Sequence, residues 1–390
     1  MFEAVIVDAI RTPIGRRKGA LANTHPVDLL GYVLSKLVER NHLDAARVDD
    51  VIIGCVTQVD EQGVNIARNA WLSAGLPESV PGTTLDRQCG SSLQALHFAA
   101  QGVMAGAYDI VIAGGVESMS RVPMGSNFTR AGTPLTEDLK NRYPFPGPWF
   151  DQAIGAEMIA KEWGFTRHDL DAFSLTSHKR ADKARSEGWF KSEIIPVPIQ
   201  NADGETISFV QDEGIRKDTS LDKMAALKPA FEGLSLITAG NASQISDGAS
   251  AVLVMRKEVA EALGLRARAR FISFAVVGVD PVTMLKGPIP ATGKVLERAG
   301  MHIDDIDLFE VNEAFASVVL AWQKEWGVSF DKLNVKGGAI ALGHPLGATG
   351  TRIIAGLLNE LEQRQKRFGL VAICEGGGMA NATIIERIDG

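Results

Sequence analysis

One cysteine stands at a turn that precedes a helical pattern. Cys89 follows Asp86-Arg87-Gln88, and apolar residues then recur at helical spacing as far as Gln101, so we expect Cys89 at or just before a helix N-terminus. Unpaired backbone N–H groups and the positive end of a helix dipole favour the thiolate, which is the nucleophilic form of cysteine. A lone cysteine is more often a buried structural residue. The position of Cys89 therefore predicts a nucleophile only if partners for it exist elsewhere.

Three later segments carry the side chains that such a nucleophile needs. They contain Asn312, then His344 in a Gly-His-Pro turn, and Cys374 shortly before a triple glycine that begins at Gly376. Histidine is the usual base for a cysteine nucleophile. Asparagine, histidine and backbone N–H groups can stabilise an oxyanion, and a second cysteine can exchange a proton. Each segment alone also fits a structural role as a helix cap, a turn or a packed strand end. Their joint presence favours chemistry at a carbonyl.

The composition is that of a globular protein with a large core. The chain has 390 residues, 45% of them hydrophobic and 22% charged, which predicts two or three domains. A net charge of −7 argues against a nucleic-acid partner, and no apolar run is long enough to span a bilayer. The three cysteines lie far apart without a C-x-x-C pair, which predicts reduced thiols in the cytoplasm and no metal site.

Strands alternate with helices along the first 120 residues, a pattern typical of an α/β layered domain. The expected strands are residues 4–7, 49–54 and 108–115, and the expected helices are residues 26–40, 64–74 and 89–106. The α/β pattern returns near residue 238, with a strand expected at 249–254.

The intervening residues, 121–228, are more polar and contain charged helical segments. One helix is expected to begin at Thr166, with Asp169 as its capping partner, and to end near Gly188. The segment contains aromatic residues that could form a small apolar core: Trp149, Phe150, Trp163, Phe173 and Trp189. We therefore expect an inserted, folded subdomain rather than a disordered linker.

The last third of the chain repeats the order of the first. The corresponding segments are 49–53 with 304–310, the turn and helix at Cys89 with those at His344, and strand 110–113 with 370–373. Asp49 precedes Cys89 by 40 residues, and Asp304 precedes His344 by 40. The repeat predicts two pseudo-symmetric α/β halves whose helix N-termini face each other, which would bring Cys89 and His344 together.

These segments resemble the signature blocks of the thiolase family, and the resemblance covers essentially the whole chain. The matching blocks include residues 114–120, 311–316 and 334–345. The resemblance implies a five-layer α-β-α-β-α fold in which an inserted loop domain covers coenzyme A (CoA). It divides the chain into an N-terminal half (residues 1–117 and 245–265), a loop domain (118–244) and a C-terminal half (266–390).

The resemblance also assigns catalytic roles to residues of this chain. It implies that Cys89 is the nucleophile that becomes acylated and that His344 activates it. His344 and a water held by Asn312 form one oxyanion hole, and the backbone N–H groups of Cys89 and Gly376 form the other. Cys374 is the acid and base.

Contacts with CoA follow from the same resemblance. Arg216 matches the position that packs on the adenine, and Ser243 matches the one that bonds the pantetheine arm. Lys223 stands where a serine often contacts CoA, and Gln152-Ala153 replaces a Met-Gly pair that lines the acyl pocket in many members. Phe315, in the block of Asn312, completes the expected contacts, and no metal is implied.

The hypothesis is a degradative 3-ketoacyl-CoA thiolase of fatty-acid or steroid side-chain β-oxidation, because the Gln152 region resembles degradative members. Three alternatives remain open: synthesis of acetoacetyl-CoA from two acetyl-CoA, a condensing enzyme that uses a carrier protein, and a catalytically silent acyl-CoA-binding subunit. The resemblance implies a homodimer or homotetramer. It leaves open whether a hydratase/dehydrogenase partner subunit binds.

Overall fold

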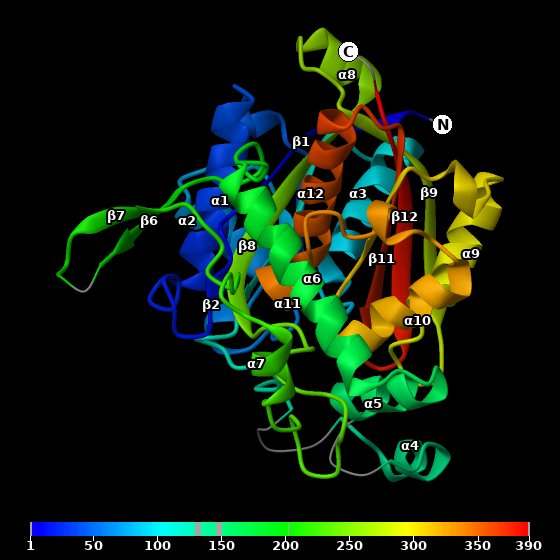
Figure 1. Ribbon diagram of the computed structural model, residues 1–390. Coiled ribbons are helices and arrows are strands. Elements are labelled where there is room, and N and C mark those ends of the chain that lie inside the picture. The colour runs from blue at the N-terminus through cyan, green and yellow to red at the C-terminus, as the bar shows by residue number, and fades with distance from the viewer. Residues whose placement is uncertain (1, 129–133, 146–149, 202, 389–390) are drawn as a thin grey trace.

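The computed structural model describes residues 2–128, 134–145, 150–201 and 203–388 (Figure 1). Its ten-stranded sheet has the order β10-β11-β12-β9-β1-β8-β5-β3-β4, with β2 beside β8. The strands of the first half are β1 (Ala4–Arg11), β2 (Gly15–Arg16), β3 (Asp50–Gly54), β4 (Gly82–Leu85), β5 (Ile110–Ser118) and β8 (Ser246–Arg256). Those of the second half are β9 (Ala269–Gly278), β10 (Leu308–Val311), β11 (Phe368–Glu375) and β12 (Met379–Arg387). The two half-sheets are joined through the pairing of Val5 and Ile6 of β1 with Arg270 and Ala269 of β9.

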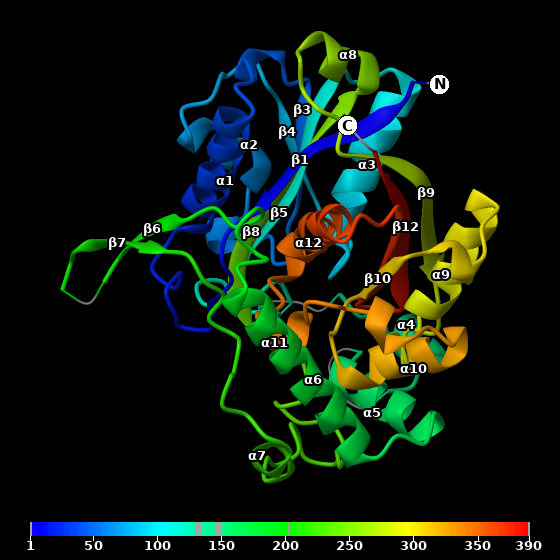
Figure 2. The ribbon, with the colours of Figure 1, turned by 45° about the horizontal axis from the view of Figure 1, so that its top comes forward.

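Helices form three layers around the two half-sheets. The central helices, α3 (Ser91–Ala105) and α12 (Thr349–Gln363), pack with strands of both halves in one apolar cluster. Figure 2 shows α12 nearly end-on between the half-sheets. The outer layers are α1 (Pro26–Arg40) and α2 (Ile66–Ser73) on the first half, and α9 (Pro288–Ala299) and α10 (Ala316–Trp326) on the second. This arrangement confirms the expected five-layer fold.

The segment between β5 and β8 is folded, as the sequence predicts. It contains α4 (Glu137–Arg142), α5 (Gln152–Glu162), α6 (Arg167–Ser186), a hairpin of β6 (Val197–Gln200) and β7 (Thr206–Phe209) that projects from the body in Figure 1, and α7 (Leu221–Ala225). Thr166 and Asp169 form the expected capping box of α6. Phe150 and Phe173 are buried, whereas the predicted contribution of Trp149 lies outside the described residues.

Shorter elements complete the fold. They are α8 (Lys257–Ala262), α11 (Ala339–Leu342) and the 3₁₀ turns Ala45–Arg47, Asp60–Gln62, Ile303–Asp305, Phe330–Lys332 and Leu346–Ala348. Within the described ranges, no helix combines the length and apolar character that crossing a membrane requires.

Hydrogen bonds correct the register of the internal repeat. Asp49 accepts the backbone N–H groups of residues 109 and 110, and Asp307 accepts those of residues 367 and 368. The two halves are thus related by 258 positions (49 to 307), and the same shift takes α3 at Ser91 onto α12 at Thr349. The predicted match of Asp49 with Asp304 was wrong by three residues. Cys89 therefore corresponds to Gly347, and His344 lies three residues before that position.

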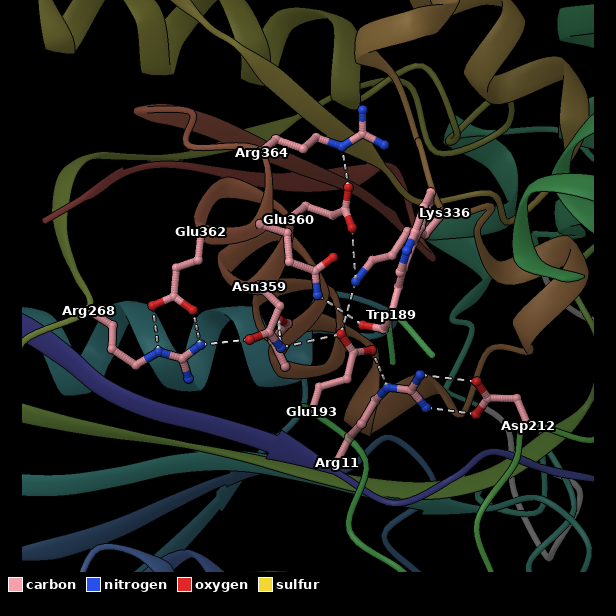
Figure 3. A network of polar contacts seen from close by, with 12 residues as sticks. Arg11, Trp189, Glu193, Asp212, Arg268, Lys336, Asn359, Glu360, Glu362 and Arg364 are labelled. Carbon is pink, nitrogen blue, oxygen red and sulfur yellow. Dashed lines mark hydrogen bonds and ion pairs between the residues drawn. The ribbon is translucent and has the colours of Figure 1, made fainter. Parts of the chain in front are cut away.

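A buried ionic network ties the insert to both halves (Figure 3). Arg11, at the end of β1, bonds Glu193 at 2.8 Å and Asp212 at 2.7 Å, and both acids belong to the insert. Lys336 of the second half also bonds Glu193, at 3.1 Å. Burial alone would raise the pKa of Glu193, but the charges of Lys336 and Arg11 outweigh it and lower the pKa below its usual value. The insert is therefore held in one position by ionised groups that water does not reach.

The central helices approach each other through glycines. A Cβ on Gly350 of α12 would lie 2.2 Å from the backbone nitrogen of Leu93 in α3, and one on Gly115 would lie 2.0 Å from the carbonyl oxygen of Gly347. The N–H of Thr351 donates to the Ser92 hydroxyl at 3.1 Å across the same contact. The two helix N-termini thus meet at a distance that only glycine permits.

Two glycines of α12 provide a matched test of this contact. We expect Gly350→Ala to lower the free energy of unfolding by about 3 kcal/mol or more, because the new methyl group overlaps backbone that cannot move aside. Gly356→Ala should instead stabilise by about 0.5–1 kcal/mol, since its nearest neighbour would lie at 3.9 Å and alanine favours helix. Denaturant unfolding measures both. Equal effects of the two substitutions would contradict the close approach.

Candidate active site

A strained turn presents Cys89 at the start of α3. Gln88 has a left-handed φ of 48°, and Asp86 holds it by accepting its backbone N–H at 2.7 Å. The Ser91 hydroxyl donates to the carbonyl of Gln88 at 2.6 Å and accepts the N–H of Arg87 at 2.9 Å. Cys89 is two residues before the helix, as the sequence predicts, and its conformation is fixed from both sides.

The thiol of Cys89 is protonated at rest, which corrects the expectation of a thiolate. Burial and then the charge of Glu375 raise its pKa to about 12. The N–H groups of Gly376 and of Cys89 itself act in the opposite direction but are weaker. The helix terminus therefore does not ionise the thiol, because removal from water costs more than the local dipole contributes. Cys89 needs a base.

His344 has its ring nitrogens assigned by a neighbour that the sequence did not reveal. The Thr349 hydroxyl donates its single hydrogen to the carbonyl of Pro345 at 2.9 Å, so it can only accept from His344 Nδ1, at 2.6 Å. The proton then lies on Nδ1, and Nε2 keeps its lone pair. Burial, with the charge of Arg352, lowers the pKa of His344 to about 3, so the ring is neutral and its Nε2 is an acceptor.

Asn312 lies next to this nitrogen. Its Nδ2 is 3.4 Å from His344 Nε2, so the structure brings together two of the predicted site residues from the second half. Its Oδ1 is buried without a hydrogen-bond partner in the described part of the chain. An acceptor left unpaired here is suited to holding a water molecule or a substrate group.

Cys374 and Gly376 lie at the end of β11, beside Cys89. Burial and then the charge of Cys89 raise the pKa of Cys374 well above its usual value, so it too carries its proton. A Cβ on Gly376 would lie 2.9 Å from Gln88 Oε1 and 3.5 Å from Gln152 Nε2. Gln152, at the first turn of α5, thus faces the same glycine turn as Cys89.

A cavity of about 810 Å³ lies within the insert, and Ile340 of the second half also lines it. Arg216 and Lys223 line it, as do Arg185, Lys217, His178 and Gln244. His178, for which no role was predicted, accepts the backbone N–H of Arg216 at 3.1 Å. The backbone carbonyl of Gln244, one of the lining residues, accepts the N–H of His344 at 3.3 Å. Its basic lining is suited to an anionic ligand.

Ser243 directly precedes Gln244, which lines the cavity, and Phe315 lies close to Ser243. Ser243 donates its N–H to the carbonyl of Ala314 at 2.8 Å, and Ala242 pairs with Phe315 as an isolated bridge. Neither belongs to the cavity lining, so their predicted contacts with CoA stay predictions. In the described residues, no group of three or more His, Cys, Asp or Glu is arranged to hold a metal ion.

A duplicated five-layer fold that holds two neighbouring buried thiols, Cys89 and Cys374, and a buried His344–Asn312 pair fits an acyltransferase that works through an acyl-cysteine. Comparison of the sequence with models of protein families supports this class of enzyme. The model described as "Thiolase, N-terminal domain" matches residues 4–258, and that described as "Thiolase, C-terminal domain" matches residues 265–387. The chain belongs to the thiolase family and is an acyltransferase.

Curated relatives align over the full length. A steroid 3-ketoacyl-CoA thiolase of Mycobacterium tuberculosis is 49% identical, with 100% of this chain and 95% of the relative covered. A 3-ketoacyl-CoA thiolase of Bacillus subtilis is 46% identical, with 99% and 100% covered. Among solved structures, the Bacillus anthracis acetyl-CoA acetyltransferase superposes with a TM-score of 0.92 at 39% identity, covering 100% of this chain and 99% of that one.

The hydroxyl of Thr349 can be tested directly. In Thr349→Val, His344 loses the acceptor that fixes its Nδ1 proton, so we expect the Nε2–H tautomer to appear in ¹⁵N NMR spectra. Alkylation of Cys89 by iodoacetamide should slow about tenfold or more, since a positioned base contributes at least that much. Thr349→Ser keeps the hydroxyl and should preserve both properties. A valine variant with an unchanged tautomer would show that Thr349 does not orient the ring.

Proposed function

We propose that the chain is a degradative 3-ketoacyl-CoA thiolase, which cleaves 3-ketoacyl-CoA to acetyl-CoA and a shortened acyl-CoA. The observation that carries the proposal is the meeting of two protonated thiols, Cys89 and Cys374, at one glycine turn. One thiol suits the nucleophile and the other the proton donor that carbon–carbon cleavage requires. The relatives named 3-ketoacyl-CoA thiolase support the substrate class.

In the first half-reaction, His344 Nε2 takes the proton of Cys89, and the sulfur attacks C3 of the substrate. The N–H groups of Cys89 and Gly376 stabilise the oxyanion that forms at C3. The tetrahedral adduct then expels C2 as the enolate of acetyl-CoA, whose oxygen His344 and a water on Asn312 stabilise. Cys374 gives its proton to C2, which leaves an acyl-Cys89 and a Cys374 thiolate.

In the second half-reaction, the same groups reverse their roles. The Cys374 thiolate takes the proton of an incoming CoA thiol, and the CoA sulfur attacks the acyl carbon. The Cys89 sulfur leaves and regains its proton from His344. Every proton is thereby returned, which gives ping-pong kinetics with a covalent intermediate.

The basic cavity supports the predicted CoA site. Arg216 and Lys223 lie in its lining, so we propose that they face the adenine end and the phosphates of CoA. Residues 118–244 then act as the loop domain over the cofactor. Gln152, close to Gly376, would face the acyl chain, where its side chain sets how bulky an acyl group can bind.

The remaining proposals concern the cellular location of the enzyme, its oligomeric state and its ligands and partners. We propose a cytoplasmic homodimer or homotetramer, supported by three cysteines that are all free and by family membership. CoA and acyl-CoA are substrates, without a resident cofactor or metal. A bound hydratase/dehydrogenase subunit stays a hypothesis.

Cys89→Ala tests the mechanism. We expect thiolysis to fall about a thousandfold or more, and the acyl adduct seen by mass spectrometry after mixing with 3-ketoacyl-CoA to disappear. Cys55→Ala is the matched control, since Cys55 is also buried and free but lies outside the site. Persistence of the adduct in Cys89→Ala would refute the proposed nucleophile.

A substrate series separates degradation from acetoacetyl-CoA synthesis. If the acyl chain lies along Gln152 and longer chains fit there, kcat/KM should rise about tenfold or more from acetoacetyl-CoA to medium-chain 3-ketoacyl-CoA, since each buried methylene contributes about 0.8 kcal/mol. CoA-dependent loss of each substrate is the measurement. Activity confined to acetoacetyl-CoA would favour the biosynthetic alternative.

A further inference from the structure

Glu375 is a buried carboxyl beside the nucleophile, and the reaction described above does not use it. Its two carboxyl oxygens have no hydrogen-bond partner in the described part of the chain. A Cβ on Gly90 would lie 1.9 Å from its Oε1, so the carboxyl lies against the backbone that directly follows Cys89. Asn381 borders the same point and also has an unpaired Oδ1, although its Nδ2 donates to the carbonyl of Gly90 at 2.9 Å.

The internal repeat supplies a counterpart in which the same carboxyl is satisfied. The shift of 258 positions relates Glu375 to Glu117 and Cys89 to Gly347 (117 to 375, 89 to 347). Glu117 accepts the N–H of Gly347 at 2.9 Å. It also accepts from Val56 N, Thr57 N and Gln62 Nε2.

By symmetry, Glu375 would accept the N–H of Cys89. It does not, because neither carboxyl oxygen of Glu375 has a hydrogen-bond partner in the described part of the chain. The half that carries the nucleophile has therefore lost the hydrogen bond that the other half keeps. The N–H set free is one of the two that the proposed oxyanion hole needs.

We propose that Glu375 is a positioning residue that gates this N–H. While its carboxyl is protonated, the N–H of Cys89 is available to the oxyanion. When the carboxyl ionises, it takes the N–H as Glu117 takes that of Gly347, and the oxyanion hole closes. The proposal rests on the proposed thiolase function but concerns a residue outside the reaction steps.

The groups around Glu375 agree with a resting acid. Burial raises its pKa well above the usual value, and Asp86 acts in the same direction, while Arg87 opposes both. The facing thiols are Cys89 and Cys374, and the charge of Glu375 raises the pKa of each. Ionisation would thus both occupy the N–H and disfavour the nucleophilic thiolate.

The pH dependence of Glu375→Met and Glu375→Gln tests the gate, because neither side chain ionises. Wild-type kcat/KM for thiolysis should fall tenfold per pH unit above the pKa of Glu375, and both variants should lack this decline. A decline that persists in both variants would overturn the proposal. A wild-type crystal structure at alkaline pH should show the carboxyl bonded to the Cys89 N–H, and a carboxyl that stays unpaired there would also overturn it.

A second measurement does not depend on thiolase activity. The folded state keeps the Glu375 proton at pH values where the unfolded chain has released it, so wild-type stability should decline with rising pH above about 4.5 by an amount that Glu375→Met lacks. This pH dependence of stability does not require thiolase activity, so it tests the protonation of Glu375 even if the enzyme acts on another thioester. Glu117→Met is the matched control. It loses four hydrogen bonds and should lower the Tm, whereas Glu375→Met has none to lose.

Discussion

The contact between α3 and α12 governs the rest of the molecule. Around the start of α12, backbone of the other half leaves no room for a side chain at Gly115 of β5, at Gly347 or at Gly350. This proximity places the turn of Cys89 and the loop of His344 on one side of the central layer. A site assembled from two halves needs such a constraint, because catalytic groups must be held to within about 0.5 Å by parts of the fold that cannot shift.

Electrostatics in the site follow from burial more than from charge. Cys89, Cys374 and His344 are all neutral at rest, because the layered fold removes them from water before any partner is considered. The insert completes this environment, and its place is fixed by the ion pairs of Arg11 with Glu193 and Asp212 (Figure 3).

The sequence was informative where a signal is local. The apolar periodicity and Pro26 gave the bounds of α1, and the Thr166–Asp169 pair marked the start of α6, because caps and periodicity depend on neighbours in the chain. The protonation of Cys89 and the role of Thr349 depend on groups brought near by folding, so the sequence could not reveal them. The repeat was assigned to Asp304 instead of Asp307 because an acidic cluster matches itself at several shifts, and only the hydrogen bonds of Asp307 distinguish them.

The strand order has a consequence for biosynthesis. In the first half-sheet, β8 (Ser246–Arg256) lies between β1 and β5, yet the ribosome makes it after the whole insert. Until then β1 and β5 have no shared partner, and each presents an unpaired edge. Such edges are prone to pair with other chains during synthesis. The first half therefore cannot complete its sheet until the insert and β8 have both been synthesised.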